Sequence, residues 1–542
     1  MARHAALVSA FIESGRLLQG VADAHFANEG ADRPIRATDA LRDFVHALAR
    51  ATIISWDSRG STVPVLPAVP EICGEQVELK VPEGYAFYAV YPEAFAEAAR
   101  ELVLSAPARV IGIRSIGASL GAIVAAALDS PPAITIRPIG DPFDRSIAIA
   151  PDLEADLLAG PAHFVIVDEG PGLSGSSFGA VADWLECRGV PLDRIAFLCS
   201  HSGAPGPQAL HRHRDRWSKA QRVVADFGPK LPSIVKVWAE DLLGPIEPEV
   251  LEISGGGWRG MQAVPQTDWP AVNPMWERRK FLFWADGRQW LARFAGLGRE
   301  GERKLEIARR LHANGLVPEP LGLANGFLVE AWRGDARPLG PGAKPIAELS
   351  RYIAARAGLP VPRPGATLAE LHVMARRNVG LVLGSDREVL MDHWLPRLPR
   401  LQDRVRPACT DNRMDRHEWL RVPNGRLLKA DAVDHHAGHD LIGCQDLAWD
   451  VAGAVVEFDL DEPQARQLIA ATEDAAGRLL DLELLDFLRV AYLAFRLGQA
   501  NMSAGMTTTR DSGRWTAREG RYSSLLDARL QLSGTERLAT FP

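Results

Sequence analysis

The stretch FVIVDEGPGLSGSSF, residues 164–178, decides the fold of the first half of the chain. It starts as a strand that is apolar throughout and ends in two adjacent carboxylates, Asp168 and Glu169. A loop rich in glycine and serine follows, and then a helix begins. Glycines let the backbone come close to a ligand, and loop amides with a helix N-terminus favour an anion. The stretch therefore predicts a sugar-phosphate site in which the carboxylates accept hydrogen bonds from ribose hydroxyls.

Similar strand–turn–helix units lie on both sides of this stretch. RVIGIRSIGASLGAIVAAAL, 109–128, repeats the pattern, and further buried strands are expected in AITIRPIG, 133–140, and RIAFLCS, 194–200. Apolar strands that alternate with helices indicate a parallel sheet covered on both faces. Ligands of such sheets bind beyond the carboxyl ends of the strands. An ordinary turn of some other doubly wound protein is the alternative interpretation.

The order of apolar strand, acidic pair and Ser/Gly loop resembles the PRPP-binding signature of type I phosphoribosyltransferases, over about residues 85–230. The family usually has six residues from the first acid to the loop glycine, whereas this chain has seven. The resemblance implies that PRPP is held with magnesium, that Asp168 and Glu169 are catalytic, and that Arg114 is a cation for pyrophosphate. The implied PRPP-binding residues are Arg114, Ser115, Gly117, Asp168, Glu169, Gly172, Ser174, Gly175, Ser176 and Ser177. A further loop with Arg137, Asp141 and Arg145 either lies over the same cleft or is a solvated surface loop.

The second half of the chain carries a different pattern. KFLFWADGRQWLARF, 280–294, predicts a hairpin that turns at Asp286-Gly287. A charged helix ends at Gly315, and the stretch CTDNRMDRHEWLRVPNGRLLKADAVDHHAGHDLIGCQDLAWD, 409–450, is rich in carboxylates. This order resembles the aminoglycoside phosphotransferase and choline kinase group. The alternatives are an unrelated helical domain and a kinase-like domain that binds nucleotide without transferring phosphate.

The kinase resemblance implies roles for individual residues. Arg293 stands where the family places its phosphate-binding lysine, and Glu306, with Glu302 as the alternate, would orient it in an ATP site. Asp411 would orient or deprotonate the acceptor hydroxyl. Asp431 would bind Mg²⁺, with Asp434 second, and His417 or Glu418 stands in the region where the family has a metal-binding asparagine. Asp446 and Asp450 reproduce an Asp-x-x-x-Asp element that braces the catalytic loop in the family.

Three histidines, His435, His436 and His439, lie close together in the same stretch. They form either a metal site or a polar loop that borders the nucleotide cleft, and the second interpretation is favoured.

Composition limits the classes of function. Apolar residues make up 47% and charged residues 24%, a soluble globular balance, and the net charge of −7 does not favour nucleic-acid binding. Five cysteines without CxxC spacing argue against structural zinc and disulfides and fit a reducing cytoplasm. No apolar run approaches the roughly 20 residues that span a bilayer. The partners expected are small molecules, and the oligomeric state is left open.

These patterns predict an α/β protein with a doubly wound parallel sheet in its first half and a two-lobed, protein-kinase-like α+β domain in its second. The expected divisions are a helical extension or hood at 1–84, a phosphoribosyltransferase-like domain at 85–245, a linker at 246–274 and a kinase-like domain at 275–542. The expected function is bifunctional: phosphoribosyl transfer from PRPP, or its reverse, and ATP-dependent phosphorylation of a small hydroxylated metabolite. The alternative is a regulator that senses PRPP or nucleotide, or a scaffold with a non-catalytic kinase-like domain.

Overall fold

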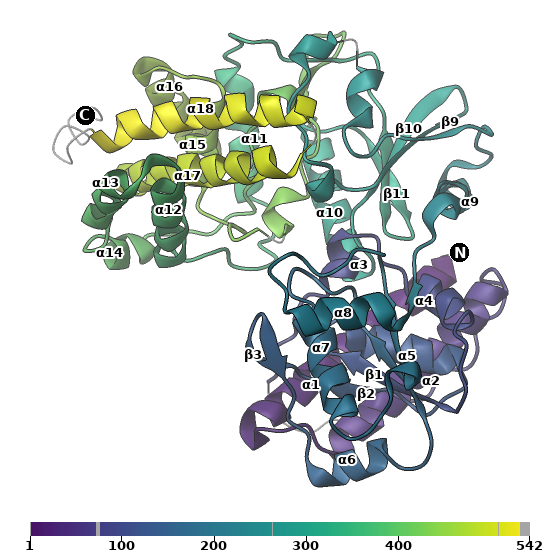
Figure 1. Ribbon diagram of the computed structural model, residues 1–542. Coiled ribbons are helices and arrows are strands. Elements are labelled where there is room, and N and C mark those ends of the chain that lie inside the picture. Colours follow the sequence, from purple (N-terminus) through teal and green to yellow (C-terminus); the bar gives the residue numbers. More distant parts are fainter. Residues whose placement is uncertain (1, 72–75, 263, 439, 508, 532–542) are drawn as a thin grey trace. The chain divides into compact units, whose positions relative to one another are not determined.

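The computed structural model describes residues 2–71, 76–262, 264–438, 440–507 and 509–531 (Figure 1). The chain divides into two units. The first consists of Met1–Asp241, Gly296–Gly301 and Ala324–Phe327, and the second of Leu242–Ala295, Glu302–Leu323 and Leu328–Pro542. Across the described residues, no helix has the length and apolar character needed to cross a membrane.

A five-stranded sheet in the order β2-β1-β5-β6-β7 forms the centre of the first unit, and every neighbouring pair in it is parallel. Its strands are β1 (Ala108–Ile113), β2 (Ile134–Ile136), β5 (His163–Val167), β6 (Ile195–Cys199) and β7 (Gln221–Val224). A small antiparallel hairpin, β3 (Ile139–Asp141) and β4 (Asp144–Ser146), follows β2. The parallel sheet expected from the apolar strands is confirmed.

Helices lie on both faces of this sheet. Phe197 of β6 packs against Phe178 of α7 and Trp217 of α8, with ring centroids 5.2 and 5.3 Å apart. Successive strand residues face opposite sides, so Gly112 faces away from its buried neighbour Ile111. A Cβ at Gly112 would lie 2.0 Å from the carbonyl oxygen of Gly117, so the start of α5 can approach β1 only because no side chain intervenes. The helices from α3 to α8 are Glu83–Phe87, Pro92–Ala99, Gly117–Ala127, Pro151–Leu157, Ser176–Glu186 and His211–Lys219.

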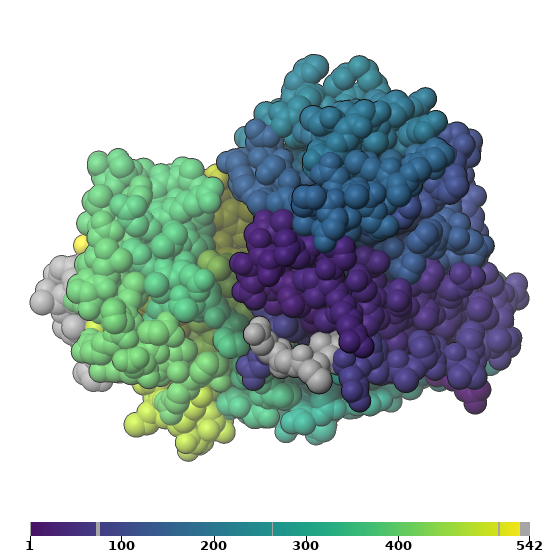
Figure 2. All heavy atoms as spheres, turned by 90° about the horizontal axis from the view of Figure 1, so that it is seen from below, coloured from purple at the N-terminus to yellow at the C-terminus, as the bar shows by residue number. Residues whose placement is uncertain are grey.

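Two long N-terminal helices, α1 (Ala2–Glu29) and α2 (Arg36–Asp57), pack against each other and against α5. Their atoms form a continuous surface of the first unit (Figure 2). The extension proposed for residues 1–84 therefore belongs to the same unit as the parallel sheet.

The second unit begins with a sheet of five strands in the order β11-β12-β10-β9-β8. They are β8 (Val250–Glu252), β9 (Lys280–Ala285), β10 (Arg288–Phe294), β11 (Pro320–Ala324) and β12 (Phe327–Ala331). The predicted hairpin is confirmed, because β9 and β10 are antiparallel partners joined by Asp286-Gly287. The stretch 246–274, expected as a linker, contains β8, which pairs with the next strand, β9, inside the second unit.

The rest of the second unit is mainly helical, in agreement with the expected α+β organisation. A three-stranded antiparallel sheet of β13 (Arg337–Pro338), β14 (Trp419–Arg421) and β15 (Leu427–Lys429) lies beside it. Fully buried side chains of α11, α12, α15 and α17, among them Trp449, Phe487 and Tyr492, share one core. Helix α9, Leu231–Leu243, lies almost wholly in the first unit. The helices from α10 to α18 are Arg299–Ala313, Ile346–Ala357, Leu368–Leu383, Ser385–Glu388, Leu398–Gln402, Leu447–Glu457, Glu462–Ala476, Leu482–Met506 and Thr509–Gln531.

Candidate active site

A cleft of about 570 Å³ lies in the second unit. Strands β9, β10 and β12 line one part of it, and the segment between Arg413 and Leu441, together with α17 and α18, lines another. Its walls include Trp258, Lys280, Leu291, Arg293, Glu330, Trp332, Asp415, His417, Glu418, Asp431, Asp434, His435, Phe495, Arg496, Trp515 and Arg518. Aromatic walls with a few convergent polar groups are typical of small-molecule sites.

The strand wall of the cleft is cationic. Lys280 and Arg293 stand opposite each other in the register of β9 and β10. Arg293 is buried, and it donates from Nε to Glu330 Oε1 at 3.0 Å and from Nη1 to Asp431 Oδ1 at 3.1 Å. It also donates to Asp434. The structure thus places Arg293 in the cleft, as its assignment to ATP requires.

The glutamate that orients Arg293 differs from the one expected. Glu306 lies on the exposed face of α10 and pairs with Arg310 at 2.8 Å, so its assignment to the ATP site is wrong in this structure. Lys304 faces inward instead, and its Nζ lies 2.7 Å from Asp434 Oδ1. The partner of Arg293 is Glu330, a single carboxylate inside the apolar strand FLVEA, 327–331. A single charged residue in an otherwise apolar strand could have predicted that Glu330 pairs with a buried cation.

Three side chains of the cleft can hold a metal ion together. Glu418, Asp431 and His435 each offer a ligand atom, and these atoms lie within 4.8 Å of one another. Carboxylate oxygens suit Mg²⁺, whereas an imidazole suits transition metals. The donor set therefore fits a divalent cation, and it includes two of the three residues assigned to magnesium. Asp431 has a φ of +51°, a conformation that non-glycine residues adopt rarely and that clusters at functional sites.

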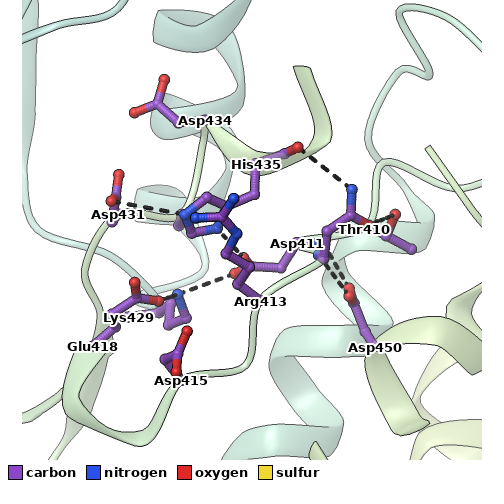
Figure 3. Close-up of polar contacts among 12 residues, drawn as sticks. Thr410, Asp411, Arg413, Asp415, Glu418, Lys429, Asp431, Asp434, His435 and Asp450 are labelled. Carbon is purple, nitrogen blue, oxygen red and sulfur yellow. Dashed lines mark hydrogen bonds and ion pairs between the residues drawn. The ribbon is translucent and has the colours of Figure 1, made fainter. Parts of the chain in front are cut away.

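Asp434, the third residue assigned to magnesium, is directed elsewhere. Its carboxylate accepts hydrogen bonds from Lys304 and Arg293, and Figure 3 shows it apart from the other three side chains. Two cations already satisfy it, so the structure does not support its role as a metal ligand.

Asp411 is fully buried and does not line the cleft. Tyr352 donates to its carboxylate. Lys429 Nζ lies 3.3 Å from Oδ2, and His435 Nδ1 lies 3.0 Å from Oδ1 (Figure 3). The structure therefore does not support the predicted direct contact between Asp411 and an acceptor hydroxyl. Asp411 instead orients His435, whose other ring nitrogen, Nε2, lies 3.8 Å from Asp431 Oδ2.

Lys429 balances negative charge next to Glu418, Asp431 and His435, which we call the metal-competent group. It is fully buried, and its Nζ donates to Glu418 Oε2 at 2.5 Å as well as contacting Asp411. Burial raises the pKa of Glu418 to about 7, and the positive charge of Lys429 opposes this rise. The charge of Lys429 thus favours the ionised form of Glu418 against the effect of burial.

The Asp-x-x-x-Asp element braces this loop, as expected. Asp450 accepts hydrogen bonds from the backbone N–H groups of Asp411, at 2.7 Å, and Asn412, at 2.9 Å (Figure 3). Asp446 caps α15 by accepting from the backbone of Ala448 at 3.0 Å, and it also accepts from the backbone of Arg406. The predicted structural role of the element is confirmed.

The end of the cleft beside α17 and α18 is charged and aromatic. Asp415 accepts two hydrogen bonds of 2.9 Å from Arg496 and one from Arg518. His417 stacks on Trp258 with ring centroids 5.9 Å apart, and burial lowers the pKa of His417 to about 4. Sequence reasoning missed Asp415, which stands four residues after Asp411 in the same loop.

The three histidines expected to lie close together occupy different environments. His435 lines the cleft, His436 is buried, and His439 lies outside the described residues. Among cysteines, Cys73 also lies outside them, and Cys187, Cys199, Cys409 and Cys444 are free thiols.

The first unit has its own candidate site, at the point where the strand order reverses. From β1 the sheet continues to β2 on one side and to β5 on the other, and ligands of open sheets bind at such a switch point. The loop with Ser115 and Gly117 leaves β1 there, and the loop after Asp168 and Glu169 leaves β5. The structure thus brings the two predicted loops to the same edge of the sheet.

The acidic pair at this point is not neutralised. Within the described residues, no ion pair engages Asp168 or Glu169, and both side chains are half-buried. Burial raises the pKa of Asp168 to about 7. Burial, Asp168 and Glu83 together raise the pKa of Glu169 to about 8. Strongly shifted groups of this kind cluster at functional sites.

The Ser/Gly loop leads directly into α7. Gly175 precedes the helix with a φ of +63°, which favours glycine, and Gly172 also has a positive φ. Ser174 and Ser176 share a hydrogen bond of 2.9 Å between their hydroxyls, and Ser176 also donates to the carbonyl of Pro142 at 2.7 Å. Ser177 is half-buried in the first turn of α7. The loop therefore offers Ser174, Ser177 and the helix N-terminus to an anion.

Arg114 is engaged away from this loop. Its guanidinium is buried and pairs with Asp23 at 3.0 Å and with Asp32 at 2.5 Å. The pyrophosphate role implied for Arg114 is not supported, because its charge is already balanced by two carboxylates of the N-terminal segment. The charges of Arg137 and of Arg145, which is half-buried in β4, oppose the rise in the pKa of Asp168, so cations do lie near the acidic pair.

No family model and no curated protein matches this chain. Similar solved structures include choline kinase LicA from Streptococcus pneumoniae, 13% identical, with a TM-score of 0.36, covering 54% of this chain and 99% of that one. A choline/ethanolamine kinase family protein from Mesorhizobium loti is 15% identical, with a TM-score of 0.34, over 48% of this chain and 88% of that one. A macrolide 2′-phosphotransferase type I is also 15% identical, with a TM-score of 0.34, over 54% and 96%. Likeness at this level assigns no activity, so the function rests on the residues of the two sites.

Proposed function

We propose that the second unit transfers a phosphoryl group from ATP to a hydroxyl group of a small molecule. The observation that carries this proposal is the cleft in which Lys280 and Arg293 stand on one wall and Glu418, Asp431 and His435 gather on another. Phosphoryl transfer requires cations around the phosphates and a divalent metal held by protein carboxylates, while little covalent chemistry falls to the protein. The cleft supplies both requirements.

Each part of the cleft has a task in this proposal. Leu291 and Leu420 line an apolar part of the cleft that suits a nucleotide base, and Lys280 and Arg293 bind the phosphates. Asp431 and Glu418, with His435, would hold Mg²⁺ or a similar cation, which neutralises charge on the transferred group when bound. The acceptor hydroxyl loses its proton to solvent as its oxygen forms a bond to the γ-phosphorus, the bond from that phosphorus to the bridging oxygen breaks, and ADP leaves. Positioning of the two substrates supplies most of the rate.

Asp431→Asn tests this function. ATP-dependent phosphorylation of a panel of hydroxylated compounds is measured with Mg²⁺, in the wild type and in the variant. We expect turnover to fall about 10²- to 10³-fold, the loss typical of a removed electrostatic group. Asp403→Asn, at an exposed aspartate, is the matched control and should leave turnover unchanged. If ATP binds but Asp431→Asn changes no activity, the second unit is a nucleotide-binding scaffold.

We also propose that the first unit binds PRPP or a related ribose 5-phosphate compound at its switch point. The half-buried carboxylates of Asp168 and Glu169 support it, since no ion pair engages them among the described residues and carboxylate oxygens accept hydrogen bonds from ribose hydroxyls. Gly175, Ser174 and Ser177 would meet the 5-phosphate, and Arg145 is a nearby cation for pyrophosphate. Bond formation or cleavage would occur at the anomeric carbon, with pyrophosphate as the leaving group.

Calorimetry with PRPP and Mg²⁺ tests this second site. The double variant Asp168→Asn with Glu169→Gln should weaken binding at least tenfold, because amides cannot accept the same charge-assisted hydrogen bonds. Asp193→Asn, at an aspartate on the opposite end of β6, is the control. Unchanged affinity in the double variant would refute the assignment. Binding without pyrophosphate release, with every acceptor tried, would identify a sensor instead of a transferase.

A further inference from the structure

An apolar groove of about 810 Å³ lies between α12 and α17. Its walls include Val373, Met374, Leu381, Val382 and Met502. Val373 is 66% exposed and Leu381 70% exposed, although both are large aliphatic side chains. Burial of such side chains lowers the free energy, and here that gain is not made. A contiguous exposed apolar surface of this kind is typical of a binding site.

The groove is continuous with the cleft of the second unit. Met374, Asn378, Leu441, Gly498 and Met502 line both spaces. Two of the shared residues, Gly498 and Met502, belong to α17, as do the cleft residues Phe495 and Arg496, whereas Lys280 and Arg293 belong to β9 and β10. A ligand whose hydroxyl group reaches the metal-competent group can therefore extend into the groove without leaving protein.

Among the five residues that line both the cleft and the groove, one, Asn378, has a polar side chain. The Asn378 side chain donates to the carbonyl of Ala494 at 3.1 Å, which fixes it between α12 and α17. A Cβ at Gly498 would lie 2.3 Å from Asn378 Nδ2, so α12 and α17 approach closely at that point. The remaining shared residues, Met374, Leu441 and Met502, are apolar, and methionine adapts to ligands of varied shape.

We infer that the acceptor of the proposed phosphotransferase is amphipathic: its hydroxylated head lies in the cleft and an apolar chain or ring system lies in the groove between α12 and α17. This inference rests on the proposed function of the cleft. The occupant follows from the continuity of the two spaces, because a small polar acceptor would fill the cleft and leave Val373 and Leu381 exposed.

The experiment uses a probe series, n-alkyl glucosides of two to eight carbons below their micelle concentrations. Their binding to the full chain is measured by calorimetry in the presence of a non-hydrolysable ATP analogue and Mg²⁺. We expect affinity to rise about fourfold for each added methylene until the groove is filled, which corresponds to roughly 0.8 kcal/mol per buried CH₂. Val373→Asp and Leu381→Asp should abolish this rise and leave the affinity for the two-carbon probe within twofold of wild type.

Controls separate the inference from the proposed function. Leu479→Asp places the same charge at a leucine that is 74% exposed outside the groove, and it should keep the chain-length dependence. Binding of the ATP analogue is measured alone in each protein. If the analogue binds but affinity does not change with chain length, or rises equally in Leu381→Asp, the amphipathic acceptor is refuted while the nucleotide site stands. If the analogue does not bind, the proposed function fails first. If Leu381→Asp converts a dimer to a monomer in sedimentation, the groove joins two copies of the chain and the inference is overturned.

Discussion

The two candidate sites differ in how their buried charges are balanced. In the second unit the carboxylates near the cleft are paired with cations: Asp431 contacts Arg293, Asp434 contacts Lys304, and Glu418 contacts Lys429. In the first unit the arginine that the sequence assigned to the ligand is paired with Asp23 and Asp32 instead.

The site of the second unit is therefore organised before a ligand binds, whereas the site of the first unit is completed by its ligand. Fixed charges that are already paired keep their geometry, and preorganised groups of this kind stabilise a transition state without moving. Asp168 and Glu169 form no ion pair among the described residues, and burial raises the pKa of each because no cation in contact offsets it. We therefore expect removal of one charge to have opposite effects in the two units.

Lys429→Met should produce the largest change. It leaves Asp411 and Glu418 buried beside each other without their shared cation, and breaking a buried ion pair costs about 3–5 kcal/mol. The free energy of unfolding of the second unit, from urea titration, should fall by that amount. Lys219→Met removes an exposed lysine paired with Asp215 and should cost less than about 1 kcal/mol. Equal losses in the two variants would show that the cleft charges are not coupled as described.

Arg293→Lys should weaken ATP binding about 10- to 100-fold. The substitution keeps the positive charge, but an ammonium group cannot reproduce the fork that reaches Glu330, Asp431 and Asp434 at once. Calorimetry with ATP and Mg²⁺ measures the change. Arg288→Lys makes the same substitution at an exposed position of β10 and should leave the affinity unchanged. An Arg293→Lys protein with wild-type affinity would mean that the phosphates do not lie against β10.

Glu169→Gln should stabilise the first unit, and more so at alkaline pH. The unfolded glutamate ionises near pH 4.3, whereas burial, Asp168 and Glu83 raise its folded pKa to about 8. The folded state therefore holds the proton more tightly, and the wild type loses stability as the pH rises from about 4 to 8. Glutamine does not ionise, so the variant should gain on the order of 1 kcal/mol over wild type at pH 8.5 and almost nothing at pH 4.

Thermal unfolding at both pH values, without ligand, measures the difference. Glu154→Gln is the control, since Arg188 holds the pKa of that exposed carboxyl below its ordinary value and no alkaline gain is expected. A Glu169→Gln protein that is less stable than wild type at pH 8.5 would show that Glu169 has a cationic partner.

Local patterns were predictable from the sequence, and long-range pairings were not. The hairpin of β9 and β10 follows from alternation and a turn dipeptide, and the brace at Asp450 follows from a fixed spacing beside an apolar helix. The partner of Arg293 and the burial of Asp411 depend instead on which strands and helices meet in space. The same holds for Arg114, whose partners Asp23 and Asp32 come from the N-terminal segment.

One long-range error could have been avoided by following helix periodicity. In α10 the buried residues Lys304, Ile307, Ala308 and Leu311 form a stripe at helical spacing. Glu306 lies off that stripe, so the apolar pattern alone already directs Lys304 inward and Glu306 toward solvent.

Glu306→Ala should therefore have the smallest effect. It removes an exposed pair with Arg310, and such pairs contribute about 0.3–0.5 kcal/mol to a helix. ATP affinity measured by calorimetry should stay within twofold of wild type, whereas Glu330→Gln, which removes the charge 3.0 Å from Arg293 Nε, should weaken it clearly. A loss of affinity in Glu306→Ala as large as in Arg293→Lys would mean that α10 turns when ATP binds and exchanges Lys304 for Glu306 at the cleft. In that case the second unit would also be completed by its ligand, and the contrast between the two sites would no longer hold.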